Sequence, residues 1–227
     1  MARPTSERKI ISLTNPKSPI SEAYVKLRTN IELSAVDAPI QVIMVTSPSP
    51  GEGKSTTASN LAVVYTQVEK KVLLIDADLR KPTIHHFLMV SNRKGLTSLL
   101  TGQTSRHEAI VQTTVPLLDV LPSGPIPPNP SELLASKKMS AFMEEFRKEY
   151  DIIILDTPPM NAVADAQIIS TLCDGTVLVI QSGNVKKDHA LRAKEGLERA
   201  KTRILGVVLN NVERKQAEGY YYYYYGE

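Results

Sequence analysis

The amino-acid sequence predicts an α/β fold, in which a mostly parallel β-sheet carries helices on both faces. Short apolar segments alternate along the chain with longer segments of helical periodicity, which is the pattern of repeated strand–helix units. The apolar segments are almost continuously hydrophobic, as expected for strands that are buried on both faces. The chain has 227 residues, of which 42% are hydrophobic, so one domain of ordinary size can bury a substantial core.

The first predicted element follows a polar start. Residues 1–18 are polar and basic and contain prolines, so we expect a flexible lead-in. A helix is expected to begin at Ser18 and Pro19, because proline suits the first helical position and apolar residues follow at helical spacing. This helix ends before Pro39, and the folded domain as a whole is expected to span residues 19–215.

The next predicted strand and helix enclose a glycine-rich loop. The strand covers residues 40–46, the helix covers residues 57–67, and residues 48–56 between them read Pro-Ser-Pro-Gly-Glu-Gly-Lys-Ser-Thr. This arrangement is typical of a phosphate-binding loop. Gly51 and Gly53 let the backbone bring its N–H groups close to an anion, and the helix N-terminus adds to the attraction. The alternative, an incidental glycine-rich turn, is disfavoured by the flanking strand and helix.

This loop supplies most of the predicted nucleotide contacts. Lys54 would bring a mobile positive charge to the terminal phosphates, and the hydroxyl of Ser55 would bind Mg²⁺. The predicted nucleotide-binding residues of the loop are Pro50, Gly51, Glu52, Gly53, Lys54, Ser55 and Thr56.

The rest of the chain continues the alternation. Further strands are predicted at residues 71–75, 115–121, 151–155, 175–181 and 204–210. Helices are predicted at residues 95–100, 105–111, 131–150, 161–172 and 186–201. Ser131 is the expected N-cap of its helix. The segment before it, residues 123–130, contains four prolines and is therefore expected to be a loop.

Acidic residues follow two of the apolar strands. Asp76 and Asp78 come directly after the second predicted strand, and Asp156 comes after the fourth. Because ligands of parallel α/β sheets bind beyond the carboxyl ends of the strands, we expect these side chains near the phosphate-binding loop. Carboxylate oxygens suit Mg²⁺ bound to a polyphosphate. The sequence therefore predicts a site for a nucleoside triphosphate with Mg²⁺, in which Ser55, Asp78 and Asp156 are the metal ligands.

Two asparagines, Asn210 and Asn211, end the last predicted strand. Their side-chain amides can both donate and accept hydrogen bonds, so they could contact the base of the nucleotide. A polar start to the following loop is the open alternative.

The net charge, the single cysteine and the lack of long apolar segments limit the classes of protein to which the chain can belong. A net charge of only +3 argues against a dedicated nucleic-acid-binding protein. Residues 186–215 include nine basic and four acidic residues, which fits a solvated helix face or a surface that faces acidic lipid or an acidic partner. The single cysteine cannot form an internal disulfide, and neither a secretory signal nor an apolar segment of membrane-spanning length is found. A cytoplasmic protein is therefore expected.

The C-terminal segment, residues 216–227, concentrates the tyrosines. Six of the nine tyrosines of the chain are consecutive there, and six adjacent tyrosines cannot all enter a core. We favour a mobile tail of phosphate acceptors, since each phosphorylation adds a charge of about −1.5 to −2. A β-prone adhesive tail or terminal strand is the alternative. The candidate acceptors are Tyr220, Tyr221, Tyr222, Tyr223, Tyr224 and Tyr225.

Together these motifs resemble the bacterial tyrosine kinases (the BY-kinase family) of capsular and exopolysaccharide synthesis. Residues 46–56 resemble the Walker A motif of that family, including Pro48. Residues 74–82 resemble its Walker A prime motif, residues 152–159 resemble its Walker B motif, and the tyrosines match its terminal cluster. The resemblance covers almost the whole chain and implies a P-loop NTPase-like fold, as in the ATPases of cell division and plasmid partition. Those ATPases typically carry an extra lysine early in the loop, where this chain has Ser49 or its neighbours instead.

The resemblance implies an ATP- and Mg²⁺-dependent protein-tyrosine kinase that phosphorylates its own tail in trans and regulates polysaccharide synthesis. The implied catalytic residues are Lys54, Asp76, Asp78 and Asp156. Asp76 is the candidate base, although Asp76 and Asp78 could exchange roles. Arg80 and Lys81 follow closely in the sequence and could steady transition-state charge, receive an acidic partner or lie in solvent.

Partners are also implied by the resemblance. A separate transmembrane adaptor would recruit the chain to the inner face of the cell membrane and activate it. Other protein-tyrosine substrates and a phosphotyrosine phosphatase are expected, and nucleic acid is not. The N-terminal helix of the family commonly carries Glu-x-x-Arg-x-x-Arg, which supports a ring of subunits. Glu22 and Arg28 match this motif, but Val25 replaces the middle arginine, so a homo-oligomeric ring of altered strength or stoichiometry is expected.

Two functions of other classes are compatible with the same fold. One is an ATP-driven assembly switch that hydrolyses ATP and has no protein substrate. The other is a non-catalytic scaffold that binds nucleotide and assembles through its tail. The clustered tyrosines argue against the switch, and the intact lysine, serine and aspartates of the site argue against the scaffold.

Overall fold

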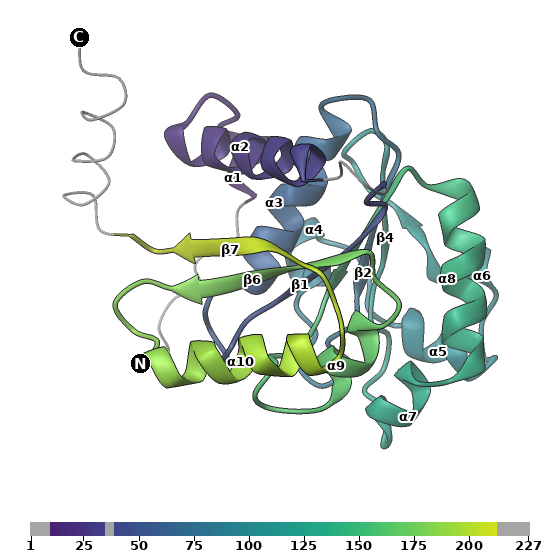
Figure 1. Ribbon diagram of the computed structural model, residues 1–227. Helices are drawn as coiled ribbons and strands as arrows, with labels where there is room; N and C mark the ends of the chain where they lie inside the picture. The colour runs from purple at the N-terminus through teal and green to yellow at the C-terminus, as the bar shows by residue number, and fades with distance from the viewer. Residues whose placement is uncertain (1–9, 35–38, 213–227) are drawn as a thin grey trace, which may run out of the picture.

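The computed structural model describes residues 10–34 and 39–212, which fold around one seven-stranded sheet (Figure 1). The strands are β1 (Val42–Thr46), β2 (Val72–Asp76), β3 (Val111–Gln112), β4 (Leu118–Leu121), β5 (Ile152–Asp156), β6 (Gly175–Gln181) and β7 (Ile204–Asn210). They lie in the order β3-β4-β2-β5-β1-β6-β7. Every neighbouring pair is parallel except β3–β4, which is antiparallel. The predicted α/β class is therefore confirmed.

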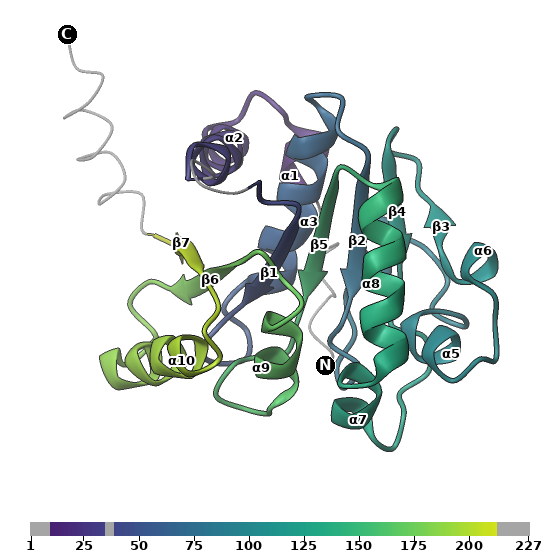
Figure 2. The ribbon, with the colours of Figure 1, turned by 45° about the vertical axis from the view of Figure 1, so that its right-hand side comes forward.

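Helices cover both faces of the sheet (Figures 1 and 2). One face carries α1 (Ile11–Thr14), α2 (Pro19–Leu33), α3 (Lys54–Thr66) and α4 (Ile84–Leu88). The other face carries α5 (Leu96–Leu100), α6 (Arg106–Ala109), α7 (Pro130–Leu134), α8 (Lys137–Glu149), α9 (Asp165–Ser170) and α10 (Lys187–Arg199). Long stretches of chain thus cross from strand to strand through a helix, as parallel pairing requires.

The continuous hydrophobicity of the strands is explained by these two layers. Val42 and Met44 of β1 belong to the core cluster on the α8 side, whereas Ile43 and Val45 belong to the cluster on the α3 side. All four side chains are fully buried. Burying one such side chain contributes about 1.5–3 kcal/mol. Successive side chains of β1 therefore point into two different apolar cores. Because a polar residue at any of these positions would be buried, the strand is hydrophobic at all four.

The N-terminal elements combine a confirmed helix with one that the sequence does not reveal. Helix α2 begins at the predicted place, where the Oγ of Ser18 accepts a hydrogen bond from the N–H of Ser21 at 3.1 Å. Helix α1 lies inside the segment that we expected to be a lead-in. Ile10 is 3% exposed, and the N–H of Ser12 donates to Oδ1 of Asn60 at 2.9 Å. A four-residue helix shows no periodicity in the sequence, so only its contacts identify it.

The long helix predicted after the proline-rich loop is two helices, α7 and α8. Ser131 is not its N-cap, because Asn129 occupies the cap position and Pro130 is the first helical residue. Helix α8 has its own cap, in which the Oγ of Ser136 accepts from the N–H of Met139 at 3.2 Å. The side chain of Ser131, near the start of α7, contacts Asp165 of α9.

Two further elements were not predicted. Helix α4 has five residues, and β3 has two, so neither is long enough for a periodic pattern. Strand β3 pairs with β4 in the antiparallel sense and forms one edge of the sheet.

The described part of the chain, which excludes residues 1–9, 35–38 and 213–227, contains no helix with the length and hydrophobicity needed to cross a bilayer. The tyrosine cluster at residues 220–225 and the predicted tail lie outside the described residues, as does the first half of the predicted lead-in.

Candidate active site

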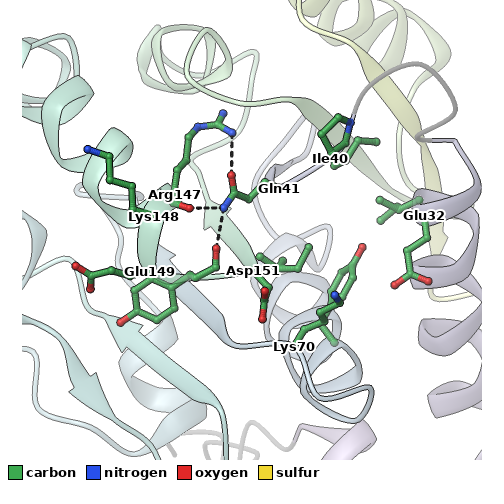
Figure 3. Close-up of a pocket in the computed structure, with 13 residues that line it drawn as sticks. Glu32, Ile40, Gln41, Lys70, Arg147, Lys148, Glu149 and Asp151 are labelled. Carbon is green, nitrogen blue, oxygen red and sulfur yellow. Dashed lines mark hydrogen bonds between the residues drawn. The ribbon is translucent and has the colours of Figure 1, made fainter.

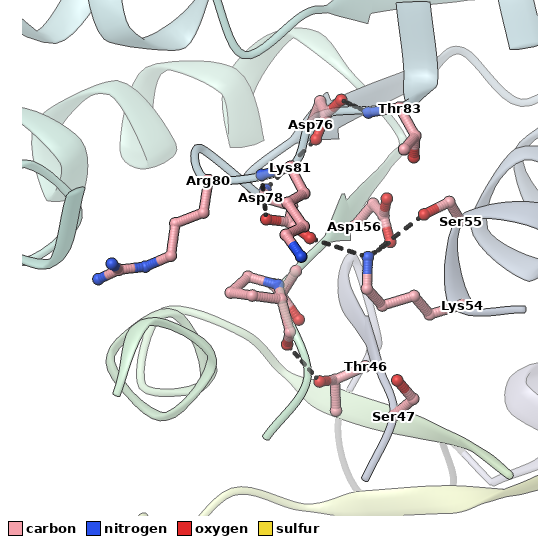
Figure 4. Close-up of polar contacts among 12 residues, drawn as sticks. Thr46, Ser47, Lys54, Ser55, Asp76, Asp78, Arg80, Lys81, Thr83 and Asp156 are labelled. Atoms are coloured by element: carbon pink, nitrogen blue, oxygen red, sulfur yellow. Dashed lines mark hydrogen bonds and ion pairs between the residues drawn. The ribbon is translucent and has the colours of Figure 1, made fainter. Parts of the chain in front are cut away.

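The acidic residues that were predicted to follow the strands lie close together at the carboxyl ends of the strands, beside Lys54 and Ser55 (Figure 4). Strand β5 lies between β2 and β1, and the register pairs Asp76 with Asp156 and Asp156 with Val45. The phosphate-binding loop follows β1 directly. The carboxylates and the loop therefore become neighbours through the strand order, although 80 residues separate the two aspartates in the sequence.

The loop has the backbone conformation that its glycines permit. Gly51 and Gly53 have φ values of +84° and +95°, in the left-handed region that favours glycine. Gly53 immediately precedes α3, so Lys54 is the first residue of that helix. A Cβ atom on Gly53 would lie 2.0 Å from Nδ2 of Asn210, so a side chain at this position would have to displace the Asn210 amide. The free N–H groups of the α3 N-terminus thus face a loop shaped for an anion.

Lys54 lies between two of the predicted carboxylates. Its Nζ is 3.1 Å from Oδ2 of Asp78, 3.6 Å from Oδ1 of Asp156 and 3.3 Å from Oγ of Ser55. The side chain is 11% exposed. Burial alone would lower the pKa of Lys54, but the charges of Asp156 and Asp78 outweigh it and raise the pKa above its usual value. The lysine therefore stays positively charged at the edge of the loop.

Asp156 is one of two buried acidic residues at the site, with Glu52, whose carboxylates lack a well-formed hydrogen bond among the described residues. The Asp156 side chain is fully buried, and neither carboxylate oxygen has a well-formed hydrogen bond within the described part of the chain. Burial raises the pKa of Asp156, and the neighbouring Lys54 only partly offsets that effect. A buried carboxylate in this state is costly unless a cation or a water-bound metal completes its surroundings.

Asp76 holds the backbone that follows β2. Its Oδ2 accepts hydrogen bonds from the N–H groups of Thr83 at 2.9 Å and Ile84 at 3.0 Å, and its Oδ1 accepts from the N–H of Asp78 at 3.3 Å. The side chain is fully buried. Burial, and then the charge of Asp156, raise the pKa of Asp76. Asp76 thus fixes the turn that presents Asp78 to Lys54.

Arg80 has a partner that the sequence analysis did not identify. Its Nε and Nη2 donate to Oδ2 and Oδ1 of Asp165 at 2.8 and 3.1 Å, and the hydroxyl of Ser131 donates to Oδ1 at 2.6 Å. Burial would raise the pKa of Asp165, but these hydrogen bonds lower it overall. Arg80 is exposed, as one of its three open roles requires, and its guanidinium also joins the loop after β2 to α7 and α9. A role for Arg80 in steadying transition-state charge or in receiving an acidic partner stays a prediction. Lys81 lies in solvent.

The two predicted base-contacting asparagines differ in position. Asn210 donates from Nδ2 to the backbone oxygen of Glu52 at 2.9 Å, so the end of β7 is tied to the phosphate-binding loop. Asn211 is exposed and has a φ of +57°. The Glu52 side chain is 2% exposed and points into the protein, where burial raises its pKa. A base contact by either asparagine stays a prediction.

The predicted oligomerisation residues lie on α2, away from these carboxylates. Glu22 is exposed. The Arg28 side chain is only 12% exposed, and its Nη1 donates to the backbone oxygen of Val64 at 2.7 Å. Arg28 therefore holds α2 against α3 of its own chain. Val25 is partly buried and packs against the core cluster on this face.

The residues at the loop fit ATP and Mg²⁺. A cationic lysine and a helix N-terminus suit the phosphates, and a hydroxyl and two carboxylates suit a hard cation. No group of three histidine, cysteine or acidic residues in the described ranges could hold a metal alone. Mg²⁺ at this place would therefore take further oxygen ligands from phosphates and water, which is its usual behaviour.

A cavity of about 570 Å³ lies elsewhere (Figure 3). It is lined by Gln41, Lys70 and Asp151, which precede β1, β2 and β5, so it is found at the amino ends of the strands. The amide of Gln41 closes part of it by donating to the backbone oxygens of Arg147 at 2.6 Å and Tyr150 at 2.7 Å. Since ligands of parallel sheets bind beyond the carboxyl ends, this cavity is not the nucleotide site.

Known proteins with similar sequences share most of the chain. Residues 40–208 match the family model described as an AAA domain. The chain is 51% identical over 217 residues to the tyrosine-protein kinase YwqD of Bacillus subtilis, a match that covers 95% of this chain and 92% of that protein. It is 41% identical over 212 residues to a putative tyrosine-protein kinase, CapB, of Staphylococcus aureus, covering 93% and 92%.

Solved structures of a tyrosine kinase domain and of a septum site-determining protein are also similar to this chain. The kinase domain of the Escherichia coli tyrosine kinase ETK is similar with a TM-score of 0.87 and 34% identity, over 91% of this chain and 81% of that one. The septum site-determining protein MinD of Pyrococcus horikoshii, solved with Mg-ADP, has a TM-score of 0.65 at 22% identity, over 79% and 76%. The latter likeness shows a shared fold, and the predicted P-loop NTPase-like architecture is confirmed.

Proposed function

This chain belongs to the family of bacterial tyrosine-protein kinases, and on that premise we propose that it transfers the γ-phosphoryl group of ATP to its own C-terminal tyrosines. The observation that carries the proposal is Lys54, held between Asp78 and Asp156 where the phosphate-binding loop meets the strand ends. The acceptors are the tyrosines at residues 220–225, whose role rests on the sequence.

The side chains of the site indicate how Mg²⁺–ATP would bind. When bound, Mg²⁺–ATP supplies the transferable phosphoryl group and a cation that neutralises phosphate charge. Lys54 would bind the terminal phosphates, and the Ser55 hydroxyl would bind the metal. Asp78 and Asp156 would bind it directly or through water, and the unsatisfied oxygens of Asp156 support this assignment. Because these groups are already positioned, little reorganisation is needed at the moment of transfer.

Proton removal from the acceptor is the second task of the site. A tyrosine hydroxyl has a pKa of about 10, so its proton must leave during or before the attack on phosphorus. We assign Asp76 as the base, because Asp78 contacts the charge of Lys54 directly and is better placed to serve the metal. Asp76→Asn should then lower kcat at saturating Mg²⁺, whereas Asp78→Asn should raise the Mg²⁺ concentration needed for half-maximal rate. The reverse pattern would exchange the two roles.

The kinase reaction is tested on the purified chain with ATP and Mg²⁺. Mass spectrometry should locate phosphate on the tyrosines at residues 220–225, and Lys54→Met should lower the rate by about two to three orders of magnitude. Circular dichroism of the variant controls for folding. Equal labelling of variant and wild type, or ATP hydrolysis without any phosphotyrosine, would contradict the proposal and favour an ATP-driven switch.

Transfer between subunits is tested by mixing two variants. The Lys54→Met chain keeps its tyrosines but lacks activity, and a second chain keeps Lys54 but carries phenylalanine at residues 220–225. Phosphate on the Lys54→Met chain would demonstrate transfer in trans. An unlabelled mixture, beside an active wild-type reaction, would show that each chain modifies only itself.

We further infer that the chain acts at the inner face of the membrane with a transmembrane adaptor, in the regulation of capsular or extracellular polysaccharide synthesis. The motif resemblance and the similarity to tyrosine-protein kinases support this. A synthetic peptide of the adaptor's cytoplasmic segment should raise the autophosphorylation rate of the isolated chain. Unchanged rates at saturating peptide would argue against activation by an adaptor.

A further inference from the structure

The outer edge of the sheet carries exposed apolar residues that the kinase chemistry does not use. Strand β7 is the last strand and, within the described ranges, pairs only with β6, so its other backbone edge lacks a strand partner. Val207 and Leu209 of β7 are 54% and 57% exposed, and Leu191 of α10 is 44% exposed. Proteins normally cover or charge a long apolar edge, because it is a ready template for another strand.

Val207 and Leu191 border a groove between α10 and the last two strands. Leu178 of β6 pairs with Val207, and Leu178 belongs to the core cluster that includes α10 residues. Since paired residues of a sheet project to the same face, Val207 stands on the α10 side. A cavity of about 520 Å³ lies there, lined mainly by aliphatic side chains, and its charged lining residues are Lys187, Lys194 and Glu198. Figure 1 shows α10 running alongside β6 and β7.

The segment that contains α10 is basic overall. Residues 186–203 include seven basic and three acidic side chains. Lys194 is 56% exposed, and its contact with Glu198 at 3.2 Å is an exposed pair that water and salt weaken. The local field therefore attracts acidic segments and repels basic ones.

We propose that this surface, the α10–β7 groove, binds an acidic peptide segment of another protein as an additional strand. The peptide backbone would pair with the free edge of β7, and its apolar side chains on the α10 side would contact Val207 and Leu191. Acidic side chains flanking them would lie near Lys187 and Lys194. This mode takes affinity from main-chain hydrogen bonds and selectivity from alternate side chains. It does not depend on the proposed autophosphorylation, since the groove flanks the first half of β7 and the nucleotide loop contacts its last residue.

Two other occupants fit less well. A second copy of the chain, paired antiparallel through β7, would place both α10 helices side by side on one face of the joined sheet, where their basic residues repel. Anionic lipid would satisfy the charge, but a bilayer surface offers no backbone groups to the β7 edge.

The test uses a fluorescent heptapeptide, Glu-Thr-Val-Thr-Val-Thr-Glu, which carries its valines and glutamates on one face of a strand. Fluorescence anisotropy should show binding at least about tenfold tighter than that of the same peptide with lysine in place of glutamate. Val207→Glu should weaken binding by about tenfold or more. Ile126→Glu is the matched control, because Ile126 is 65% exposed and lies in a loop far from β7, and it should bind as wild type.

A second measurement separates strand addition from other binding. Amide hydrogen exchange by NMR should show new protection of alternate β7 amides when the acidic peptide is added. Equal affinity for both peptides, unchanged binding by Val207→Glu, or unprotected β7 amides would each overturn the proposal. Binding of phosphatidylserine vesicles without binding of the peptide would assign the surface to lipid, and concentration-dependent dimerisation of the wild type lost in Val207→Glu would assign it to a second copy.

Discussion

A single buried lysine sets the charge balance of the site. Lys54 faces Asp78 and Asp156 within 3.1 and 3.6 Å, so one positive charge serves two carboxylates. Asp156 in addition lacks a well-formed hydrogen bond among the described residues. Removing charges from water costs more than one ion pair returns, unless further partners are present. The buried charge of Asp156 therefore destabilises the nucleotide-free protein, and a bound cation would offset this cost. Functional sites commonly lower stability in this way.

Replacing Asp156 with asparagine should therefore stabilise the free protein. We expect Asp156→Asn to raise the unfolding free energy without nucleotide by about 1 kcal/mol, or a few degrees in melting temperature. The same variant should lose most of the stabilisation that Mg²⁺–ATP gives to the wild type. Thermal denaturation with and without Mg²⁺–ATP measures both effects. A variant that melts earlier than wild type and still responds fully to Mg²⁺–ATP would show that Asp156 has a purely structural role.

At the scale of elements, one carboxylate joins three of them at the amino ends of the strands. Asp174, just before β6, accepts from Nη2 of Arg147 in α8 at 2.7 Å and from the N–H groups of Gln41 and Val42 at 2.9 and 2.7 Å. Burial would raise the pKa of Asp174, but these hydrogen bonds lower it overall. A carboxylate with a lowered folded-state pKa stabilises the fold above its unfolded pKa of about 4, and the effect is lost as pH falls.

Because of this contact, the free energy of unfolding should decrease as pH falls into the acidic range. At pH 7, Asp174→Asn should lower the unfolding free energy by about 1–3 kcal/mol, because Arg147 loses its charged partner. The difference from wild type should shrink as pH falls below about 4, the unfolded pKa, and through the lower pKa of Asp174 in the folded protein. Urea denaturation at several pH values measures it. Glu198→Gln, which removes an exposed pair, is the control and should change little. A difference that persists unchanged in acid would rule out the ionised form as its cause.

At the scale of the whole molecule, α2 carries the residues that we expect to act in the assembly of several copies. Arg28 is largely engaged with Val64 of its own chain, whereas Glu22 is exposed and Val25 is partly buried. The resemblance to the family places an arginine where this chain has Val25. The surface available to a neighbouring subunit therefore lacks one positive charge that the family motif commonly supplies.

Restoring that charge should strengthen self-assembly. We expect Val25→Arg to shift the protein toward larger oligomers in sedimentation velocity at a fixed concentration, because Glu22 and the new arginine complete the motif. Val25→Gln controls for the loss of the apolar side chain, and Glu22→Gln combined with Val25→Arg should remove the gain. An unchanged distribution for a folded Val25→Arg protein would mean that α2 does not control assembly through this motif.

Local signals were sufficient for much of the fold and for several of the residues that meet at the carboxyl ends of the strands. The apolar strands, the glycine-rich loop and the aspartates at strand ends are each visible within a few residues of sequence. The general behaviour of parallel sheets then predicts that strand-end groups gather at one edge, as Lys54, Asp78 and Asp156 do. Elements too short for periodicity, such as α1 and β3, gave no such signal, and Ser131 was wrongly assigned as a cap because Pro130 can itself begin a helix.

Other features follow only from the tertiary structure, because they join residues far apart in the chain. The pairing of Arg80 with Asp165 spans 85 positions, and an acidic residue at the start of a helix is too ordinary to indicate such a partner. The contact of Asn210 with Glu52 and the place of β7 as the last strand of the sheet depend on strand order, which no local pattern specifies. The sequence by itself determined the chemistry available at the site. The packing of the sheet decided which charges meet, because distance and burial, and not residue type alone, set their interaction.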